Sequence, residues 1–229
     1  MAGIYIIGTL TLILMHANQI PASFALIFKS AFTPKAAGGA AAGIAVRKAI
    51  QYGVARGLFS NEAGMGSTPH AHARAKAKSP HHQGLCAMIG VFIDTFIILN
   101  LTVFSILTTG ALSSGKDGTA LTQYAFSHSF GSFGILFVAV CLFFFAFSTI
   151  LGWHFFGLTN AKYLGGKNAA IPYSIVVVIC IVIGSTLKLD LVWAMADFFN
   201  SLMVVPNILA LIVLSGVVSK AMKAGQKMK

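Results

Sequence analysis

The chain has 229 residues, of which 57% are hydrophobic and 9% are charged, and its mean hydropathy is +0.83. A soluble domain of this size needs more charge to cover its surface, so the composition indicates an all-α polytopic membrane protein. The formal net charge is +11. The basic residues lie in short segments between apolar runs and at the C-terminus, a pattern typical of membrane topology that argues against a nucleic-acid partner.

About six spans are predicted. The apolar run at residues 3–16 is short for a full crossing, and residues 20–32 either continue it or lie at the membrane interface. Residues 38–66 are rich in small residues suited to close helix packing, but they contain three basic residues that are unusual for a lipid-facing helix. The other predicted spans are long apolar runs at residues 84–110, 130–158, 171–187 and 190–218.

Basic charge alternates between the two ends of the spans. Residues 68–83, residues 159–170 and the tail at 219–229 carry lysine and arginine, whereas the connection at 111–129 has one lysine beside an aspartate. The two loops and the tail are therefore predicted to face the cytoplasm. Residues 1–229 then form a single multi-pass transmembrane domain in the cell (inner) membrane, with a cytoplasmic C-terminus.

The stretch RGLFSNEAGMGSTPHA, residues 56–71, interrupts this apolar pattern. Gly64 and Gly66 tolerate backbone angles that other residues rarely adopt, and Thr68 before Pro69 is typical of a helix N-cap and first turn. We expect a helix to end near Phe59, unwind, and resume near Pro69. At membrane depth such irregular backbone persists only where it lines a cavity or is packed by protein.

Two interpretations of this predicted break stay open from the pattern alone. Discontinuous helices in secondary transporters present amides to an anionic group and carbonyls to a cation. Ser60 and Asn61 would add hydrogen bonds to a small zwitterion. Alternatively, the segment is a reentrant or extramembrane loop that merely joins two spans, because glycine-rich turns are common.

A second candidate site lies in the span at 130–158. Ser148 and Thr149 are adjacent hydroxyl residues, and Thr149 shares a helix face with Trp153 because the two are four residues apart. Sodium prefers oxygen ligands, so the hydroxyl pair is a candidate sodium site. The alternative is that both hydroxyls bond to the preceding turn of their own helix, which is usual in membrane helices.

Two acidic residues lie well inside predicted spans and one lies in the break. Asp94 and Asp197 either carry a proton or lock helices together through Arg56 or a hydroxyl such as Thr95, and a structural role is favoured because no proton relay flanks them. Glu62 lies in the break itself. It is expected to cap backbone amides or to balance Arg56, with a direct contact to the cation as a further option.

Two other features have structural and functional interpretations. Four histidines of the loop at 68–83 either chelate a metal ion or belong to a solvated loop; they are His70, His72, His81 and His82. Pro206 is expected to kink the last span, either as a hinge or simply to fit its packing.

Several of these motifs together resemble one family. RGLFSNEAGMGSTPHAHA, followed by Gln83-Gly84 and VFIDTFII, resembles the signature of the alanine or glycine:cation symporter family. The resemblance extends upstream to IPASFALIFKSAFTPKAAGGAAAG and downstream through FAFSTILGW and ADFFNSLMVVPN, so it covers almost the whole chain. It implies sodium- or proton-coupled import of alanine, glycine or a related amino acid, with no enzymatic activity, on an inverted-repeat fold of two five-helix repeats.

The resemblance also implies roles for individual residues. FSNEAGMGS would line the substrate pocket, and the hydroxyl pair of FAFSTILGW would hold sodium. The predicted substrate residues are Phe59, Ser60, Asn61, Gly64, Gly66, Ser67, Thr149 and Trp153, the predicted sodium ligands are Ser148 and Thr149, and the predicted structural or gating residues are Arg56, Glu62, Asp94 and Asp197. Co-transported Na⁺ is expected, and no other cofactor.

Two inverted repeats imply a chain roughly twice this length, of which this sequence matches the carboxyl-terminal half. We therefore expect a fragment that begins near the fifth core helix, lacks the other broken helix, and partners a missing amino-terminal half. The predicted function is sodium-coupled import of alanine or glycine by alternating access. The alternative is a non-transporting membrane scaffold or a channel subunit, although a channel needs a continuous polar stripe along several spans. An enzyme is not expected, since no nucleophile with a spaced base is present.

Overall fold

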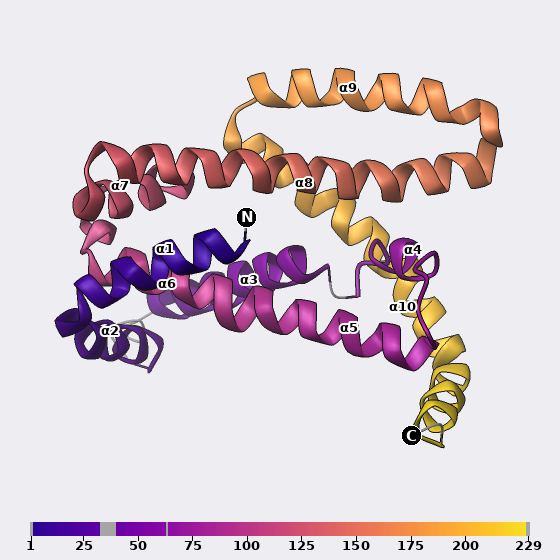
Figure 1. Ribbon diagram of the computed structural model, residues 1–229, viewed down its shortest axis with the longest axis horizontal. Coiled ribbons are helices and arrows are strands. Elements are labelled where there is room, and N and C mark those ends of the chain that lie inside the picture. Colours follow the sequence, from indigo (N-terminus) through magenta and orange to yellow (C-terminus); the bar gives the residue numbers. More distant parts are fainter. Residues whose placement is uncertain (1, 33–39, 63, 228–229) are drawn as a thin grey trace. The chain divides into compact units, whose positions relative to one another are not determined.

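A computed structural model of the chain describes residues 2–32, 40–62 and 64–227, and every regular element in these ranges is helical. Figure 1 shows the helices in chain order. The predicted all-α class is confirmed. Ala63 of the predicted break and Lys229 of the basic tail lie outside the described residues.

The first two helices form a bent pair. α1 (Ala2–Met15) and α2 (Ile20–Phe32) are separated by the short 3-10 turn η1 (Ala17–Gln19), and the chain bends there by 78°. This bend divides the apolar residues of the segment between two helices, each too short to cross a membrane alone. α3 (Ala40–Asn61) follows.

Four helical segments are long and apolar enough to cross a membrane, and the count rises to five if the bent pair is one span. They are Pro80–Thr108, Ser132–Gly165, Lys167–Thr186 and Leu189–Lys223. The described residues thus hold fewer spans than the six predicted. The difference is α3, because its 22 residues include Arg47, Lys48 and Arg56, and many of its apolar positions are alanine or glycine.

The first of these segments contains a change of helix type. α5 (Pro80–Phe92) leads into the π-helical stretch η3 (Ile93–Leu99), and α6 (Asn100–Thr108) completes it. Hydrogen bonds in a π-helix span five residues instead of four, so the helix widens locally without ending. Asp94 lies in the first turn of η3.

The connection predicted at residues 111–129 is largely helical. It contains the 3-10 turn η4 (Ala111–Ser114) and most of α7 (Gly118–Phe130). α7 is too short to cross a membrane. Its Ala125 and Phe126 are fully buried, so α7 is stabilised by packing that its mixed sequence does not reveal.

Helices also extend beyond the predicted spans. α8 (Ser132–Gly165) runs through the first half of residues 159–170, and η5 (Lys167–Ala169) occupies much of the rest. α9 (Ala170–Thr186) follows, and α10 (Leu189–Lys227) includes nearly all of the basic tail. Lysine is a good helix former, so a helix need not end where its apolar run ends. The cytoplasmic position of these segments stays a prediction.

The chain folds into two compact units. The first comprises Met1–Val54 and Phe92–Ser148, and the second comprises Ala55–Val91 and Thr149–Lys229. The first unit has an aromatic core, in which Phe126 stacks on Tyr5 and Phe137 with ring centroids 6.2 and 5.4 Å apart. Such ring pairs add to the stabilisation given by buried area alone.

One polar contact in the first unit joins α1 to α6. Thr102 Oγ1 donates its proton to the Ile98 carbonyl at 2.8 Å, so it accepts a hydrogen bond from the Tyr5 hydroxyl at 2.7 Å. Tyr5 is buried, and a buried hydroxyl without a partner is costly in apolar surroundings. The bond therefore favours one alignment of α1 against α6.

The turn between α7 and α8 brings two backbone segments close together. Gly131 has a φ of 58°, and its N–H donates to the Ser127 carbonyl at 2.8 Å. A Cβ atom at Gly134 would lie 2.3 Å from the Phe126 carbonyl oxygen. The start of α8 can approach the end of α7 this closely only because residue 134 has no side chain.

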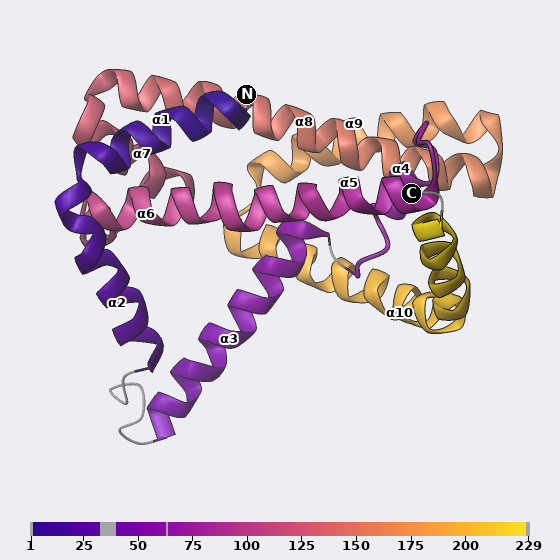
Figure 2. The ribbon, with the colours of Figure 1, turned by 60° about the horizontal axis from the view of Figure 1, so that its bottom comes forward.

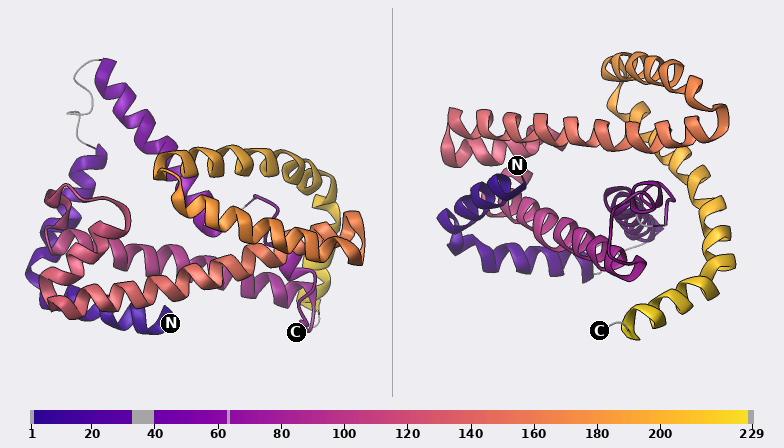
Figure 3. Two further views of the ribbon diagram at one scale, coloured as in Figure 1. Left: turned by 90° about the horizontal axis from the view of Figure 1, so that it is seen from above. Right: turned by 45° about the vertical axis from the view of Figure 1, so that its right-hand side comes forward.

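In the second unit, the last part of α8 and α9 run side by side in opposite directions (Figure 1). Ser174 Oγ donates to the Ala170 carbonyl at 2.9 Å, so His154 Nε2 is the donor in its 3.0 Å contact with that hydroxyl. Figure 3 shows that α10 is curved. Pro206 lies inside this helix, where it removes one backbone hydrogen bond and favours a bend.

Gly134→Ala is expected to lower the midpoint of thermal unfolding of the detergent-solubilised protein. The added methyl group overlaps backbone atoms that cannot rotate aside, and overpacking of this kind costs about 1–3 kcal/mol. Gly152→Ala on the same helix is the matched control, because nothing lies within 4 Å of a Cβ atom there. Equal midpoints for the two variants would contradict the close approach of α7 and α8.

Candidate functional site

The chain leaves the helical conformation between α3 and α4 (Figure 2). α3 ends at Asn61, two residues later than predicted, and α4 (Pro69–His72) begins where predicted. Glu62, Gly64 and Gly66 have positive φ angles of 52°, 76° and 85°. Such angles are ordinary for glycine but uncommon for glutamate. We call residues 62–68 the helix break.

The helix that resumes after the break is short. α4 has only four residues, so its dipole is small and few amides are aligned at its start. The expectation that Thr68 caps this helix is wrong. Its backbone is already helical, with φ −56° and ψ −36°, and its side chain makes no capping hydrogen bond, whereas an N-cap residue needs extended backbone.

The Glu62 side chain closes the break on itself. One carboxylate oxygen accepts hydrogen bonds from Ser67 Oγ at 2.7 Å and from Thr68 Oγ1 at 3.2 Å. Ser67 is 4% exposed, so its hydroxyl proton is held within the protein. These bonds join the first residue of the break to the last two and offset the strain of the left-handed Glu62 backbone.

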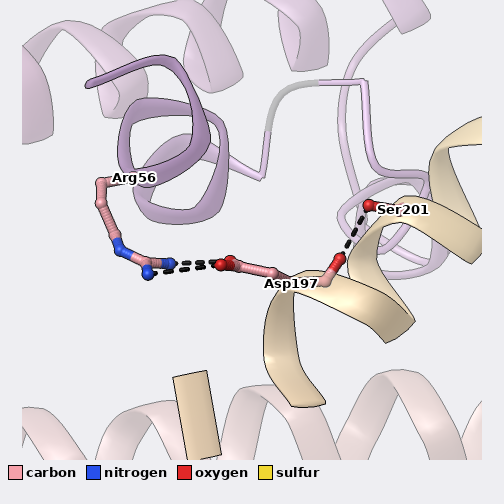
Figure 4. Close-up of polar contacts among 3 residues, drawn as sticks. All are labelled: Arg56, Asp197 and Ser201. Carbon is pink, nitrogen blue, oxygen red and sulfur yellow. Dashed lines mark hydrogen bonds and ion pairs between the residues drawn. The ribbon is translucent and has the colours of Figure 1, made fainter. Parts of the chain in front are cut away.

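An ion pair ties the last turns of α3 to α10 (Figure 4). Arg56 donates from Nη1 and Nη2 to the two carboxylate oxygens of Asp197 at 2.7 and 3.3 Å. The Arg56 guanidinium also lies 3.9 Å from the centre of the Trp193 ring, which packs edge-on against Phe59 at 5.4 Å. Bidentate geometry is the strong form of this ion pair. Of the partners considered for Asp197 from the sequence, the structure gives it Arg56.

A second contact from α10 reaches the break itself. Asn207 Nδ2 donates to the Gly64 carbonyl oxygen at 2.8 Å, and a Cβ atom added at Gly66 would lie 3.0 Å from the Asn207 Cβ atom. Neither Asn207 nor Trp193 was among the predicted site residues. The available signal for Asn207 was an amide side chain directly after Pro206 in an apolar run.

The other residues predicted around the break differ in exposure. Ser60 is exposed, Asn61 is half-buried, and Asn61 Nδ2 donates to the Gly57 carbonyl at 2.9 Å. Met65, which lies within the FSNEAGMGS stretch expected to line the pocket, is 2% exposed. The break therefore turns one apolar and one hydroxyl side chain, Met65 and Ser67, into the protein.

The predicted sodium residues lie on α8. Ser148 Oγ donates to the Phe145 carbonyl at 2.9 Å, as the alternative interpretation expects, and the Trp153 ring packs on Phe156 at 5.9 Å. These contacts lie within the helix. Ser148 belongs to the first unit and the helix break to the second, so a site shared by the break and the hydroxyl pair stays a prediction.

Two histidines of the loop at 68–83 have other partners. His72 Nδ1 is 2.7 Å from Gln83 Nε2, and His70 Nδ1 is 2.9 Å from the Ser67 carbonyl oxygen, to which it donates. Among the described residues, the structure contains no group of three or more histidine, cysteine or acidic side chains that could hold a metal ion. The metal interpretation of these histidines therefore gains no support.

Comparison with known families decides between the classes considered. The profile of the sodium:alanine symporter family matches residues 1–229. The chain belongs to the sodium:alanine symporter family. The resemblance inferred from RGLFSNEAGMGSTPHAHA and the later motifs is confirmed, and membership indicates a multi-pass membrane protein of a transporter family, not an enzyme. It does not favour the alternative of a scaffold or channel subunit.

The relatives include proteins named as symporters and uncharacterised transporters. The chain is 40% identical to the sodium/alanine symporter AgcS of Methanococcus maripaludis over 228 residues, which are 98% of this chain and 49% of that protein. It is 40% identical to the probable sodium/glutamine symporter GlnT of Bacillus subtilis over 225 residues, 97% of this chain and 46% of that protein. An uncharacterised transporter of Haemophilus influenzae is 43% identical, with 97% of this chain and 49% of that protein covered. The chain thus spans about half the length of these relatives.

Arg56→Gln and Asp197→Asn are each expected to lower the midpoint of thermal unfolding, and the double variant to lose less than their sum. The second replacement removes the charge that the first leaves unpaired. The coupling is expected to be about 1 kcal/mol, because the two side chains are 33% and 42% exposed.

Asp190→Asn is the control for this cycle, because Asp190 lies in the first turn of the same helix, away from the ion pair. Combined with Arg56→Gln it should give additive losses. Additive losses for Arg56→Gln with Asp197→Asn would show that the ion pair does not stabilise the second unit.

Proposed function

We propose that the protein takes part in sodium-coupled import of a small neutral amino acid, alanine or glycine, across the cytoplasmic membrane by alternating access. In this proposal the chain supplies the carboxyl-terminal half of an inverted-repeat symporter, and a further segment supplies the other broken helix. The observation that carries the proposal is the helix break at residues 62–68, which α10 anchors. The family profile matches the chain over residues 1–229.

The break is suited to a small zwitterion. Backbone groups released from helical pairing can bind both the carboxylate and the ammonium group of an amino acid. Phe59, Ser60, Asn61, Gly64, Gly66 and Ser67 would line this part of the pocket, and Thr149 and Trp153 of α8 would complete it. Because residue 64 is a glycine and nothing lies within 4 Å of its Cβ position, the substrate can approach the protein backbone closely there.

Sodium would bind the oxygens of Ser148 and Thr149. Ser148 Oγ donates its proton to the Phe145 carbonyl, which leaves the lone pairs of that oxygen available to a cation. Bonding to the preceding turn and ligation of sodium are therefore compatible for this residue. Entry of the ion releases about 2.3 kcal/mol per charge for each 100 mV of membrane potential, which would drive import of the neutral substrate.

The proposed topology follows from the distribution of charge. The loops at residues 68–83 and 159–170 and the tail at 219–229 would face the cytoplasm, together with the C-terminus. Arg56 and Asp197 would keep α3 and α10 together before the break, and Asp94 would hold its helix against neighbours. Glu62 would brace the break through Ser67 and Thr68, without contacting the ion directly.

A transport assay on the native gene product tests the proposal. An affinity tag placed after Lys229 at the chromosomal gene would purify whichever polypeptide carries residues 1–229, and its mass relative to 24.1 kDa would reveal any further segment. In proteoliposomes, uptake of labelled alanine or glycine is expected to require an inward sodium gradient. Uptake that persists when potassium replaces sodium would contradict the proposed sodium coupling. Uptake of glutamine but not of alanine or glycine would contradict the proposed substrate.

Thr149→Ala is expected to raise the sodium concentration for half-maximal uptake about tenfold, which corresponds to about 1.4 kcal/mol for one lost oxygen ligand. Thr159→Ala is the matched control, since Thr159 lies on the same helix and its hydroxyl donates to the Phe155 carbonyl. Sodium dependence should be unchanged in the control. The same sodium dependence in both variants would rule out Thr149 as a ligand.

A further inference from the structure

α10 contacts the helix break and its approach at two separate points. The Arg56–Asp197 pair lies before the break, and the hydrogen bond from Asn207 to the Gly64 carbonyl lies within it. Ten residues separate Asp197 from Asn207 on α10, which corresponds to about 15 Å along a helix axis. The same helix therefore fixes both the end of α3 and the middle of the break.

The Gly64 carbonyl lies outside any helix, so its hydrogen-bond donor has to come from another part of the chain. α3 has ended at Asn61, so the regular helical pattern no longer supplies an N–H to this oxygen. A backbone carbonyl without a partner is costly at membrane depth. The Asn207 amide, at 2.8 Å, is a neutral donor that meets this need without introducing a charge.

The same side chain limits the backbone sterically. The Asn207 Cβ, Cγ and Oδ1 atoms lie 3.0–3.1 Å from the position of a Cβ atom at residue 66. Gly66 also has a φ of 85°, so a larger residue there meets both backbone strain and the Asn207 side chain. One amide group thus contacts two residues of the break, one by a hydrogen bond and one by close packing.

We propose that Asn207 is a positioning residue of the amino acid site. It fixes the direction of the Gly64 carbonyl and, through the short chain to Gly66, the orientation of the backbone groups between them. Asn207 acts through this backbone and does not itself bind the substrate. What the break binds rests on the proposed function, whereas the role of Asn207 in holding the break does not.

Hydrogen–deuterium exchange measures this role without transport. Asn207→Asp keeps the side-chain shape but replaces the donor with an oxygen facing the Gly64 carbonyl, and Asn207→Ala is measured beside it in case a carboxylate on α10 prevents folding. Peptides covering residues 62–69 are expected to exchange at least about tenfold faster in these variants. Peptides from α9 should exchange as in the wild type.

Ser215→Ala is the matched control, because the Ser215 hydroxyl donates to the Ile212 carbonyl within α10. It should leave exchange at residues 62–69 unchanged. Exchange in Asn207→Asp and Asn207→Ala that equals the wild type would overturn the proposal.

Uptake kinetics then separate positioning from simple loss of folded protein. A misaligned break weakens substrate binding, so the KM for the amino acid is expected to rise about tenfold in Asn207→Ala, a loss of the size expected for one hydrogen bond. A purely structural role would lower the maximal rate at unchanged KM, and that result would overturn the assignment. If the wild-type protein takes up no amino acid, the proposed function fails, and hydrogen exchange alone decides whether Asn207 holds the break.

Discussion

A membrane interior provides no water to satisfy a backbone carbonyl, so a helix can be interrupted there only where protein groups replace the lost hydrogen bonds. In the break, the Asn207 amide donates a hydrogen bond to the Gly64 carbonyl, and Glu62 accepts hydrogen bonds from the hydroxyls of Ser67 and Thr68. The left-handed backbone of the break is therefore maintained by specific side chains. Its shape depends on α10 as much as on its own glycines.

The charged Arg56 side chain beside the break also has a protein partner. Charged residues make up only 9% of this apolar chain, and Arg56 is one of them. Asp197 neutralises its charge, and the Trp193 ring covers the face of its guanidinium group. These partners are 141 residues apart in sequence, and Asn207 is 143 residues from Gly64. The break is thus completed by the last helix of the chain, and long-range pairing determines its geometry.

Much of the fold could be predicted because apolar runs and helices coincide, and most predicted spans agree with helices to within a few residues. α3 was predicted as a span because it is rich in small residues, although its three basic residues make it too polar for one. α7 was not predicted because its stability comes from the burial of Ala125 and Phe126. The break itself was visible in its glycines and Pro69. The length of α4 could not be predicted, because Pro69 indicates where a helix begins and not how far it continues. Asn207 could not be assigned, because a lone amide gives no indication of its distant partner.

The π-helical stretch η3 has a consequence for the rest of the first unit. Such a stretch holds one residue more than the α-helix that would replace it, so it behaves as an insertion absorbed without a loop. Deleting one residue between Ile93 and Leu99 would rotate α6 by about 100° relative to the start of η3. α1 contacts η3 as well as α6. If α1 kept its contacts with η3, Thr102 would no longer face the Tyr5 hydroxyl, from which it now accepts a hydrogen bond. The register of α6 against α1 is therefore set by one additional residue in η3.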